Sequence, residues 1–170
     1  MLESIKQLLK NNPLSDVYLA GSIDIEDGIA DFCPDMRFLY FELGEKLIEF
    51  ESINQYSKLS LKIVDSVRYQ FEFDEDMLPG KSSVRHIILT DSMSATNGVK
   101  NINFYNLEEQ ESQLICDGLQ IRLVNGQELF LDPSFYFGIN IGGLEQKKFW
   151  VENLTNDSVP NETFIEIVHE

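Results

Sequence analysis

Apolar and polar residues alternate along several short stretches of the chain, which is the period of strands that bury one face and expose the other. In LSLKIVD, Leu59, Leu61 and Ile63 alternate with polar residues, and RYQFEFDED (68–76) shows the same alternation. Further strands are predicted in RFLYFEL (37–43), KLIEFES (46–52), RHIILTD (85–91) and INFYNL (102–107), whereas the composition of MLPGKSS (77–83) predicts a loop. The segments on either side of Gly44 are expected to form a hairpin.

The segment GLQIRLVNGQELFLD predicts another hairpin, and side-chain parity predicts its register. A two-residue loop would place Ile121 opposite Phe130, so the leucine side chains of the two strands would point to opposite faces of the hairpin. A three-residue loop over 124–126 instead pairs Ile121 with Leu129 and puts Gly126 at the left-handed position that such a loop favours. The three-residue loop is therefore expected.

Two helices are predicted, one at the N-terminus and one near the C-terminus. MLESIKQLLKNNP places four apolar residues on one helical face, namely Leu2, Ile5, Leu8 and Leu9. LEQKKFWVENL (144–154) also has near-helical apolar spacing, and Trp150 is expected to anchor it to the core. Strands connected this closely are antiparallel. The predicted class is α+β: a predominantly antiparallel curled sheet or half-barrel with these two helices.

The stretch DPSFYFGINIGG (132–143) contains three glycines within six residues and resembles a ligand-binding loop. Its spacing matches neither of the glycine patterns that bind phosphate, and it contains no lysine. We expect a structural role in which Asp132 and Pro133 end a hairpin arm, 135–141 is extended, and Gly142 and Gly143 lead into the next helix.

The length of 170 residues fits a single domain over 1–170, and the charge of this domain is strongly negative. It has 13 Lys and Arg against 29 Asp and Glu, so the net charge is −16. This charge repels nucleic-acid phosphates and anionic lipids, so neither nucleic-acid nor membrane binding is expected. It would attract a basic protein, although simple solubility is the more economical interpretation of charge alone.

The chain shows no secretion signal and no apolar run near the roughly 20 residues that span a bilayer. Cys33 and Cys116 fit no metal or redox spacing. A cytoplasmic protein with two reduced, buried thiols is expected.

The sequence offers no clear catalytic or metal-binding group. In the acidic segment DIEDGIADFCPD (24–35), the spacing of a calcium loop would put Ile23 and Ile25 at ligand positions, so an acidic solvated loop is preferred. His86 lies within an apolar run, and Ser22 lacks the second glycine of a G-x-S-x-G nucleophile turn. No catalytic residue, metal ligand or cofactor is predicted, and the protein is not expected to be an enzyme.

The run LFLDPSFYFGINIGGLEQKKFWVENL (129–154) resembles the C-terminal segment of small acidic bacterial immunity proteins from contact-dependent growth-inhibition and related polymorphic toxin systems. The resemblance covers 26 residues of framework and carries over no binding residue. It implies a cytoplasmic, non-catalytic protein that binds and blocks the toxin domain of its own system. Many such toxins are nucleases with a basic surface, which an acidic inhibitor can occupy in place of phosphates.

We therefore expect an immunity protein that neutralises a cognate basic toxin domain through an acidic surface. The candidate interface residues are Glu72, Asp74, Glu75 and Asp76; Glu108, Glu109 and Glu111; and the acids of 24–35. An interface also needs an apolar anchor, for which Phe104 and Tyr105 are predicted. Each acidic group taken alone is also explained by a solvated face. The alternative function is a small-ligand-binding or hydrolytic domain that uses a pocket in the sheet, favoured by convergent carboxylates or by His86 at its mouth.

Overall fold

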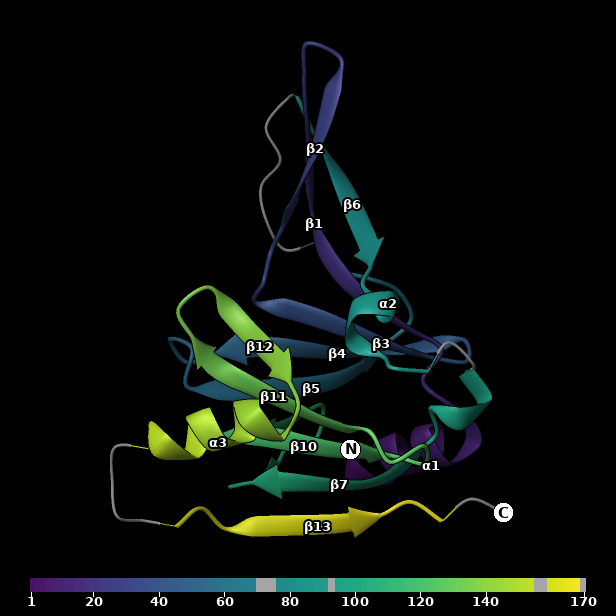
Figure 1. Cartoon of the computed structure of the whole chain (residues 1–170), viewed down its shortest axis with the longest axis vertical. Helices are drawn as coiled ribbons and strands as arrows, with labels where there is room; N and C mark the ends of the chain where they lie inside the picture. The colour runs from purple at the N-terminus through teal and green to yellow at the C-terminus, as the bar shows by residue number, and fades with distance from the viewer. Residues whose placement is uncertain (70–75, 92–93, 155–158, 169–170) are drawn as a thin grey trace.

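The computed structural model describes residues 1–69, 76–91, 94–154 and 159–168, and it has the predicted α+β class. Helix α1 (Leu2–Asn11) lies at the N-terminus and α3 (Leu144–Glu152) near the C-terminus, as expected. Between them lie the single-turn helix α2 (Arg85–Ile88) and the 3₁₀ turn η1 (Ser94–Thr96). The strands are antiparallel and form two unclosed sheets (Figure 1).

The larger sheet, sheet A, has the strand order β2-β1-β3-β4-β5-β9-β8, and β6 pairs with the other side of β1. Its strands are β1 (Asp16–Glu26), β2 (Ile29–Pro34), β3 (Phe38–Leu43), β4 (Lys46–Ile53), β5 (Lys58–Val64), β6 (Met77–Ser83), β8 (Glu108–Glu109) and β9 (Leu114–Cys116). The predicted hairpin around Gly44 is confirmed, because β3 and β4 pair from Leu43 opposite Lys46. The φ angle of Gly44 is 64°, a value that glycine adopts without strain.

Sheet B has the order β12-β11-β10-β7-β13. Its strands are β7 (Val99–Tyr105), β10 (Gly118–Leu123), β11 (Glu128–Phe135), β12 (Gly138–Gly142) and β13 (Glu162–Glu166). The predicted hairpin register is confirmed: Ile121 lies opposite Leu129, and Gly126 has a φ of 89° in the three-residue loop.

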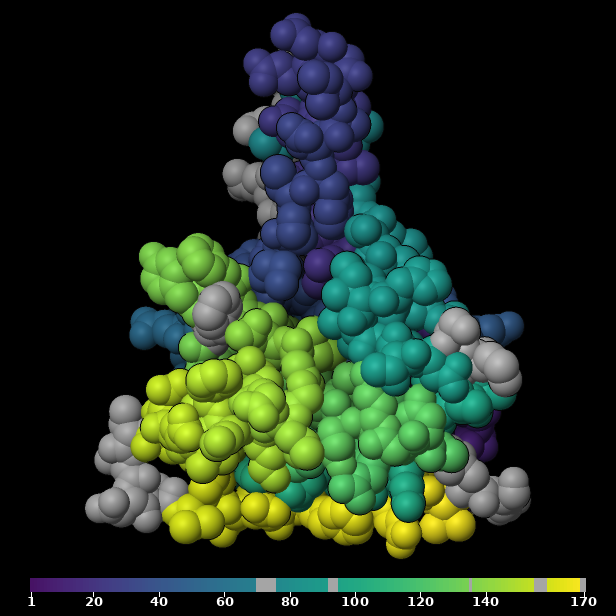
Figure 2. Space-filling view, viewed as in Figure 1, coloured from purple at the N-terminus to yellow at the C-terminus, as the bar shows by residue number. Residues whose placement is uncertain are grey.

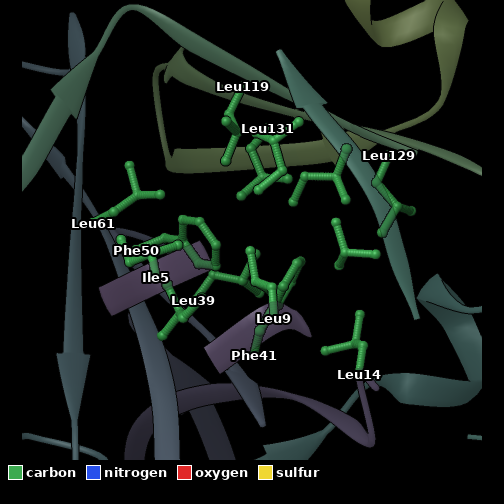
Figure 3. Packing of buried hydrophobic residues seen from close by; sticks show 14 of the residues in the cluster. Ile5, Leu9, Leu14, Leu39, Phe41, Phe50, Leu61, Leu119, Leu129 and Leu131 are labelled. Atoms are coloured by element: carbon green, nitrogen blue, oxygen red, sulfur yellow. The ribbon is translucent and has the colours of Figure 1, made fainter. Parts of the chain in front are cut away.

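The main hydrophobic core lies between the two sheets and includes one face of α1. Ile5 and Leu9 of α1 are almost fully buried, which confirms the helical face predicted from their spacing. Figure 3 shows these side chains beside others from sheet A, such as Phe50, and from sheet B, such as Leu119 and Leu131. Because all three elements share this core, the sheets and α1 stabilise one another.

A second, aromatic cluster attaches α3 to the outer face of sheet B. The ring of Trp150 lies 5.0 Å from that of Tyr105 and 5.4 Å from that of Phe130, between ring centroids. A side chain at Gly118 would come within 3.2 Å of the Trp150 ring, so glycine leaves the space that the indole fills. The predicted anchoring role of Trp150 is confirmed, and the outer side of α3 exposes Leu144, Phe149 and Val151.

A buried carboxylate holds the chain after β5 against the outer face of sheet A. The Glu49 carboxylate is fully buried; it accepts hydrogen bonds from the Arg68 guanidinium, which forms an ion pair with it, and from the Tyr40 hydroxyl. Burial, and then the Glu49 charge, raise the pKa of Tyr40 above its ordinary value. The buried charge is thus paired and hydrogen-bonded, the condition under which such a group is tolerated.

Two predicted elements in the middle of the chain are wrong. MLPGKSS is a strand, β6, that pairs along β1 from Met77 opposite Asp24 to Ser83 opposite Tyr18. RHIILTD contains the helical turn α2 in place of a strand, with the Leu89 N–H donating to the Arg85 carbonyl. A short run of consecutive apolar residues has no period that separates strand from helix. The strand predicted over 68–76 is absent at 68–69, and 70–75 lie outside the described residues.

The stretch DPSFYFGINIGG is a hairpin. Asp132 and Pro133 continue β11, with an irregularity in register before Phe135 pairs with Gly138, and β12 returns alongside. The expectation that Asp132 and Pro133 end the strand is therefore wrong. Gly138 has a φ of 125°, and a Cβ atom there would lie 2.0 Å from the Met36 carbonyl oxygen. The glycine allows the backbones to approach so closely that the Ile139 N–H donates to Met36 at 2.7 Å.

Candidate protein-interaction surface

A three-stranded arm projects from the body of the protein (Figures 1 and 2). We define the arm as residues 21–34 of β1, β2 and their turn, together with 76–80 at the start of β6. In it β1 pairs with β2 on one side and with β6 on the other. The turn residues Asp27 and Gly28 have φ values of 51° and 78°, as in the two-residue turns that favour hairpins. The expectation of a loop over 24–35 is corrected, because most of this segment is paired strand.

One face of the arm gathers carboxylates. Asp24 lies directly opposite Asp31, and Glu26 shares their face because it is two residues from Asp24 on the same strand. These three side chains and Asp27 in the turn form the acidic face. With Ile29 they line a shallow hollow of about 150 Å³.

Within the part of the chain that the structure describes, the charges of the acidic face have no cationic partner. Residues 19–36 contain no Lys, Arg or His. The ion pairs of the described part of the chain all lie outside the acidic face. Lys81 of β6 lies at the foot of the arm, with its amino nitrogen 4.2 Å from the centroid of the Tyr18 ring. Like charges directly opposite each other destabilise a strand pair, so the arm holds Asp24 and Asp31 together at a cost in stability.

Exposed aliphatic side chains accompany the carboxylates. Ile29 is 64% exposed beside the acidic face, and on the opposite face Ile25 and Leu78 are about half exposed. Ile23, Phe32 and Leu78 lie in one cross-strand row on that opposite face. The arm therefore carries both the charge and the apolar area that a protein interface requires.

The first predicted acidic group falls largely outside the described residues. Glu72, Asp74 and Glu75 belong to the undescribed segment 70–75. Asp76 is exposed and directly precedes Met77, which pairs with Asp24. Asp76 and the acidic loop were predicted as separate groups, and the structure brings them together on the arm.

In the second predicted group, Glu108, Glu109 and Glu111, most of the carboxylates make contacts within the protein. Glu108 forms an ion pair with Lys58 at 2.9 Å. Glu109 accepts hydrogen bonds from the Leu2 N–H and from the N-terminal amino group, and these contacts lower the pKa of its carboxyl. Glu111 is exposed. This group helps to fix α1 to β8, which reduces its capacity to attract a partner.

The predicted apolar anchors Phe104 and Tyr105 are wrong for a binding role, because both are buried. Phe104 is fully enclosed in the core between the sheets, and Tyr105 lies beneath α3 against Trp150. Phe104 faces the core and Tyr105 is covered by α3, so neither side chain is available to a partner.

A pair of exposed aromatic residues was missed by the sequence analysis. Tyr136 and Phe137 form the tip of the β11–β12 hairpin, are 80% and 66% exposed, and lie edge to face with ring centroids 5.0 Å apart. The sequence held a partial signal, because adjacent side chains of a strand point to opposite faces and a turn can expose both. The following Gly138 marks that turn.

The described residues show little reactive chemistry. Among them, no group of three or more His, Cys, Asp or Glu side chains is arranged to hold a metal ion. His86 is exposed on α2 and lines none of the hollows described in this article. Cys116 is buried, and desolvation raises the pKa of its thiol. Cys33 is exposed on the arm, contrary to the expectation of two buried thiols.

Within the described residues, no helix has the length and apolar character needed to cross a membrane. The chain matches no known protein family. Searches of curated proteins and of solved structures likewise found no significant similarity. The candidate surface is therefore argued from the chemistry of the arm itself.

Proposed function

We propose that this protein is a cytoplasmic immunity protein that binds a cognate basic toxin domain through its acidic arm and thereby blocks it. The single observation that carries the binding part of this proposal is the arrangement of the acidic face: carboxylates without cationic partners, on a projecting arm that also exposes isoleucines. The resemblance of 129–154 to immunity proteins supplies the class of partner.

The energetics of the arm favour a cationic partner. Asp24 and Asp31 face each other across two strands, and their repulsion is relieved when lysine or arginine side chains approach. The net charge of −16 acts in the same direction at longer range and accelerates the encounter with a basic protein at low salt. Ile29, beside the acidic face, provides the apolar contact that rim charges alone lack.

The test is binding of the toxin domain encoded next to this protein. A triple variant, Asp24→Asn, Glu26→Gln and Asp31→Asn, removes three charges from the acidic face. We expect it to weaken the complex at least about tenfold and to slow association at low salt, as measured by surface plasmon resonance.

The matched control removes three exposed charges elsewhere, through Glu45→Gln, Glu145→Gln and Glu152→Gln. It changes the net charge equally and is expected to have only a small effect. Equal losses in the two triple variants would assign binding to net charge and reject the acidic face. If the wild-type protein binds no neighbouring toxin domain, the immunity function itself is rejected.

A small-ligand-binding or hydrolytic domain remains the alternative. The hollow on the acidic face gathers carboxylates, which that alternative would use, but it is shallow and has neither His86 nor a buried nucleophile in its lining. The binding of a protein is therefore the function that we propose.

A further inference from the structure

An apolar pocket lies at the foot of the arm, where the two sheets and α2 meet. Its volume is about 180 Å³, and its walls come from β1, the segment 36–39, α2 and β12. The lining includes Leu19, Met36, Val84, Ile87, Ile139 and Ile141, and every lining residue is apolar. Figure 2 shows the teal surface of α2 and the green surface of β12 on either side of the base of the arm.

The size and lining of the pocket define what it can hold. An apolar cavity of about 150 Å³ in another protein binds benzene, so this volume suits one aromatic ring or one branched aliphatic group. Pockets for metabolites or cofactors are larger, about 300–1,000 Å³, and carry polar groups that orient the ligand. An ion or a polar small molecule would find no hydrogen-bonding side chain in this lining.

The entrance presents an apolar residue to solvent. Ile87 of the single-turn helix α2 is 82% exposed, although it also lines the pocket. Val84 and Ile88, on the same turn, are partly buried against the core. A ligand in the pocket would cover Ile87 and so remove from water apolar surface that is exposed in the free protein, which favours binding.

The pocket and the acidic face lie within reach of one partner. Leu19 lines the pocket, and Asp24 is five residues farther along β1, about 17 Å at the rise of an extended strand. Because five is an odd number, the two side chains point to opposite faces of β1. On the returning strand, Met36 lines the pocket and Asp31 is again five residues away. A standard interface buries about 800 Å² on each partner, a patch about 30 Å across. One partner of that size reaches both sites by extending around the exposed strand β2 at the edge of the arm.

We propose that the pocket receives one uncharged apolar side chain, aromatic or branched aliphatic, of the same basic partner whose cationic residues contact the acidic face. This inference rests on the proposed function and adds an apolar anchor point to it. Charge selects the partner, and the pocket fixes its position on the arm.

The first experiment needs no partner. Toluene, an analogue of the phenylalanine side chain, is titrated into the full chain with ¹³C-labelled isoleucine methyl groups, and n-butylamine, an analogue of the lysine side chain, serves as the control. We expect saturable shifts for Ile87, Ile139 and Ile141 with toluene and none with butylamine. The absence of saturable toluene shifts at these methyl groups would overturn the inference.

A matched pair of variants tests the role of the pocket in recognition. Ile87→Glu places a charge at the entrance, and Val124→Glu makes the same change at another exposed position, on the β10–β11 turn. Ile87→Glu should abolish toluene binding and weaken the complex with the neighbouring toxin domain at least about tenfold, while Val124→Glu leaves both unchanged. Thermal unfolding of both variants verifies that they are folded.

The outcomes separate this inference from the proposed function. If the acidic-face triple variant weakens the complex and Ile87→Glu does not, the pocket has no role in recognition and the proposed function stands. If the wild-type protein forms no complex, the proposed function fails together with the assignment of the partner, and toluene binding alone decides whether the pocket accepts an apolar group.

Discussion

At the scale of single residues, the two cysteines have opposite surroundings. Cys116 belongs to the core between the sheets, where loss of solvent raises the pKa of its thiol and suppresses the reactive thiolate. Cys33 lies on the exposed strand β2, opposite Ser22 and on the same face of the arm as Asp31. The fold therefore makes one thiol inert and leaves the other accessible.

We predict that iodoacetamide at pH 8 modifies Cys33 alone in the native protein. The pKa of the Cys116 thiol is raised, so at pH 8 this thiol stays protonated, and alkylation needs the thiolate. Intact-mass spectrometry should show one adduct in buffer and two in denaturant. A Cys33→Ser variant serves as the control and should show no native adduct. Two adducts under native conditions would contradict the buried position of Cys116.

The mistaken anchors, Phe104 and Tyr105, define a limit of residue-level prediction. Their alternation placed them correctly on a strand, but alternation implies that one of two neighbours faces solvent. Both are buried because Phe104 faces the core and Trp150 of α3, about 40 residues later, covers Tyr105 on the other face of β7. Nothing local to INFYNL indicates that cover, so the candidate site could be predicted only in its charges and not in its apolar contacts.

At the scale of elements, the three glycines of the β11–β12 hairpin and its exit have different roles. A Cβ at Gly138 would meet the Met36 backbone at 2.0 Å, and the φ of 125° is itself strained for other residues. A Cβ at Gly142 would lie 2.8 Å from the Gln146 Cβ in the first turn of α3. At Gly143 the nearest atom is 3.6 Å away, an ordinary contact.

The alanine variants should therefore rank by stability. We expect Gly138→Ala to cost about 3 kcal/mol or more, Gly142→Ala about 1–2 kcal/mol, and Gly143→Ala less than about 0.5 kcal/mol. Urea unfolding followed by tryptophan fluorescence measures all three, because Trp150 of α3 is buried against sheet B. The opposite order would mean that the hairpin does not depend on its contact with Met36. The sequence-based expectation gave equal weight to Gly142 and Gly143, and the geometry separates them.

Elements were predictable where strands pair with near neighbours in the chain. The β3–β4 and β10–β11 hairpins have short turns, so parity and turn residues fix their registers. Strand β6 pairs with β1, about 60 residues earlier, and its Pro79 and Gly80 read locally as a loop. Pro79 is tolerated because β6 is an edge strand within the described part of the chain, and Gly80 leaves room for the Ile23 side chain. The pairing of β6 depends on a strand far away in the sequence, and the composition of the segment itself does not indicate that strand.

At the scale of the whole molecule, salt should act on folding and on binding with opposite signs. A net charge of −16 repels itself in the compact state, and added salt screens that repulsion. Attraction to a basic partner is screened by the same ions. We predict that raising NaCl from about 0.05 M to 0.5 M increases the urea midpoint of the free protein and lowers the association rate of the complex. Potassium acetate is the control against ion-specific effects. A midpoint that falls with salt would show that the described ion pairs outweigh the net repulsion.

The carboxylates of the arm also bear on the solubility of the protein. Strand β2 is the end strand of sheet A among the described residues, so the outer backbone groups of a nearly fully exposed strand are open to another strand. Such edges lead to fibres when they are flat and uncharged. When two copies approach along this edge, Asp31 and its neighbours meet identical charges and the pairing is opposed. The negative charge that we assign to partner recognition thus also keeps copies of the protein apart, and a mutation that made the arm neutral would expose the cell to its aggregation.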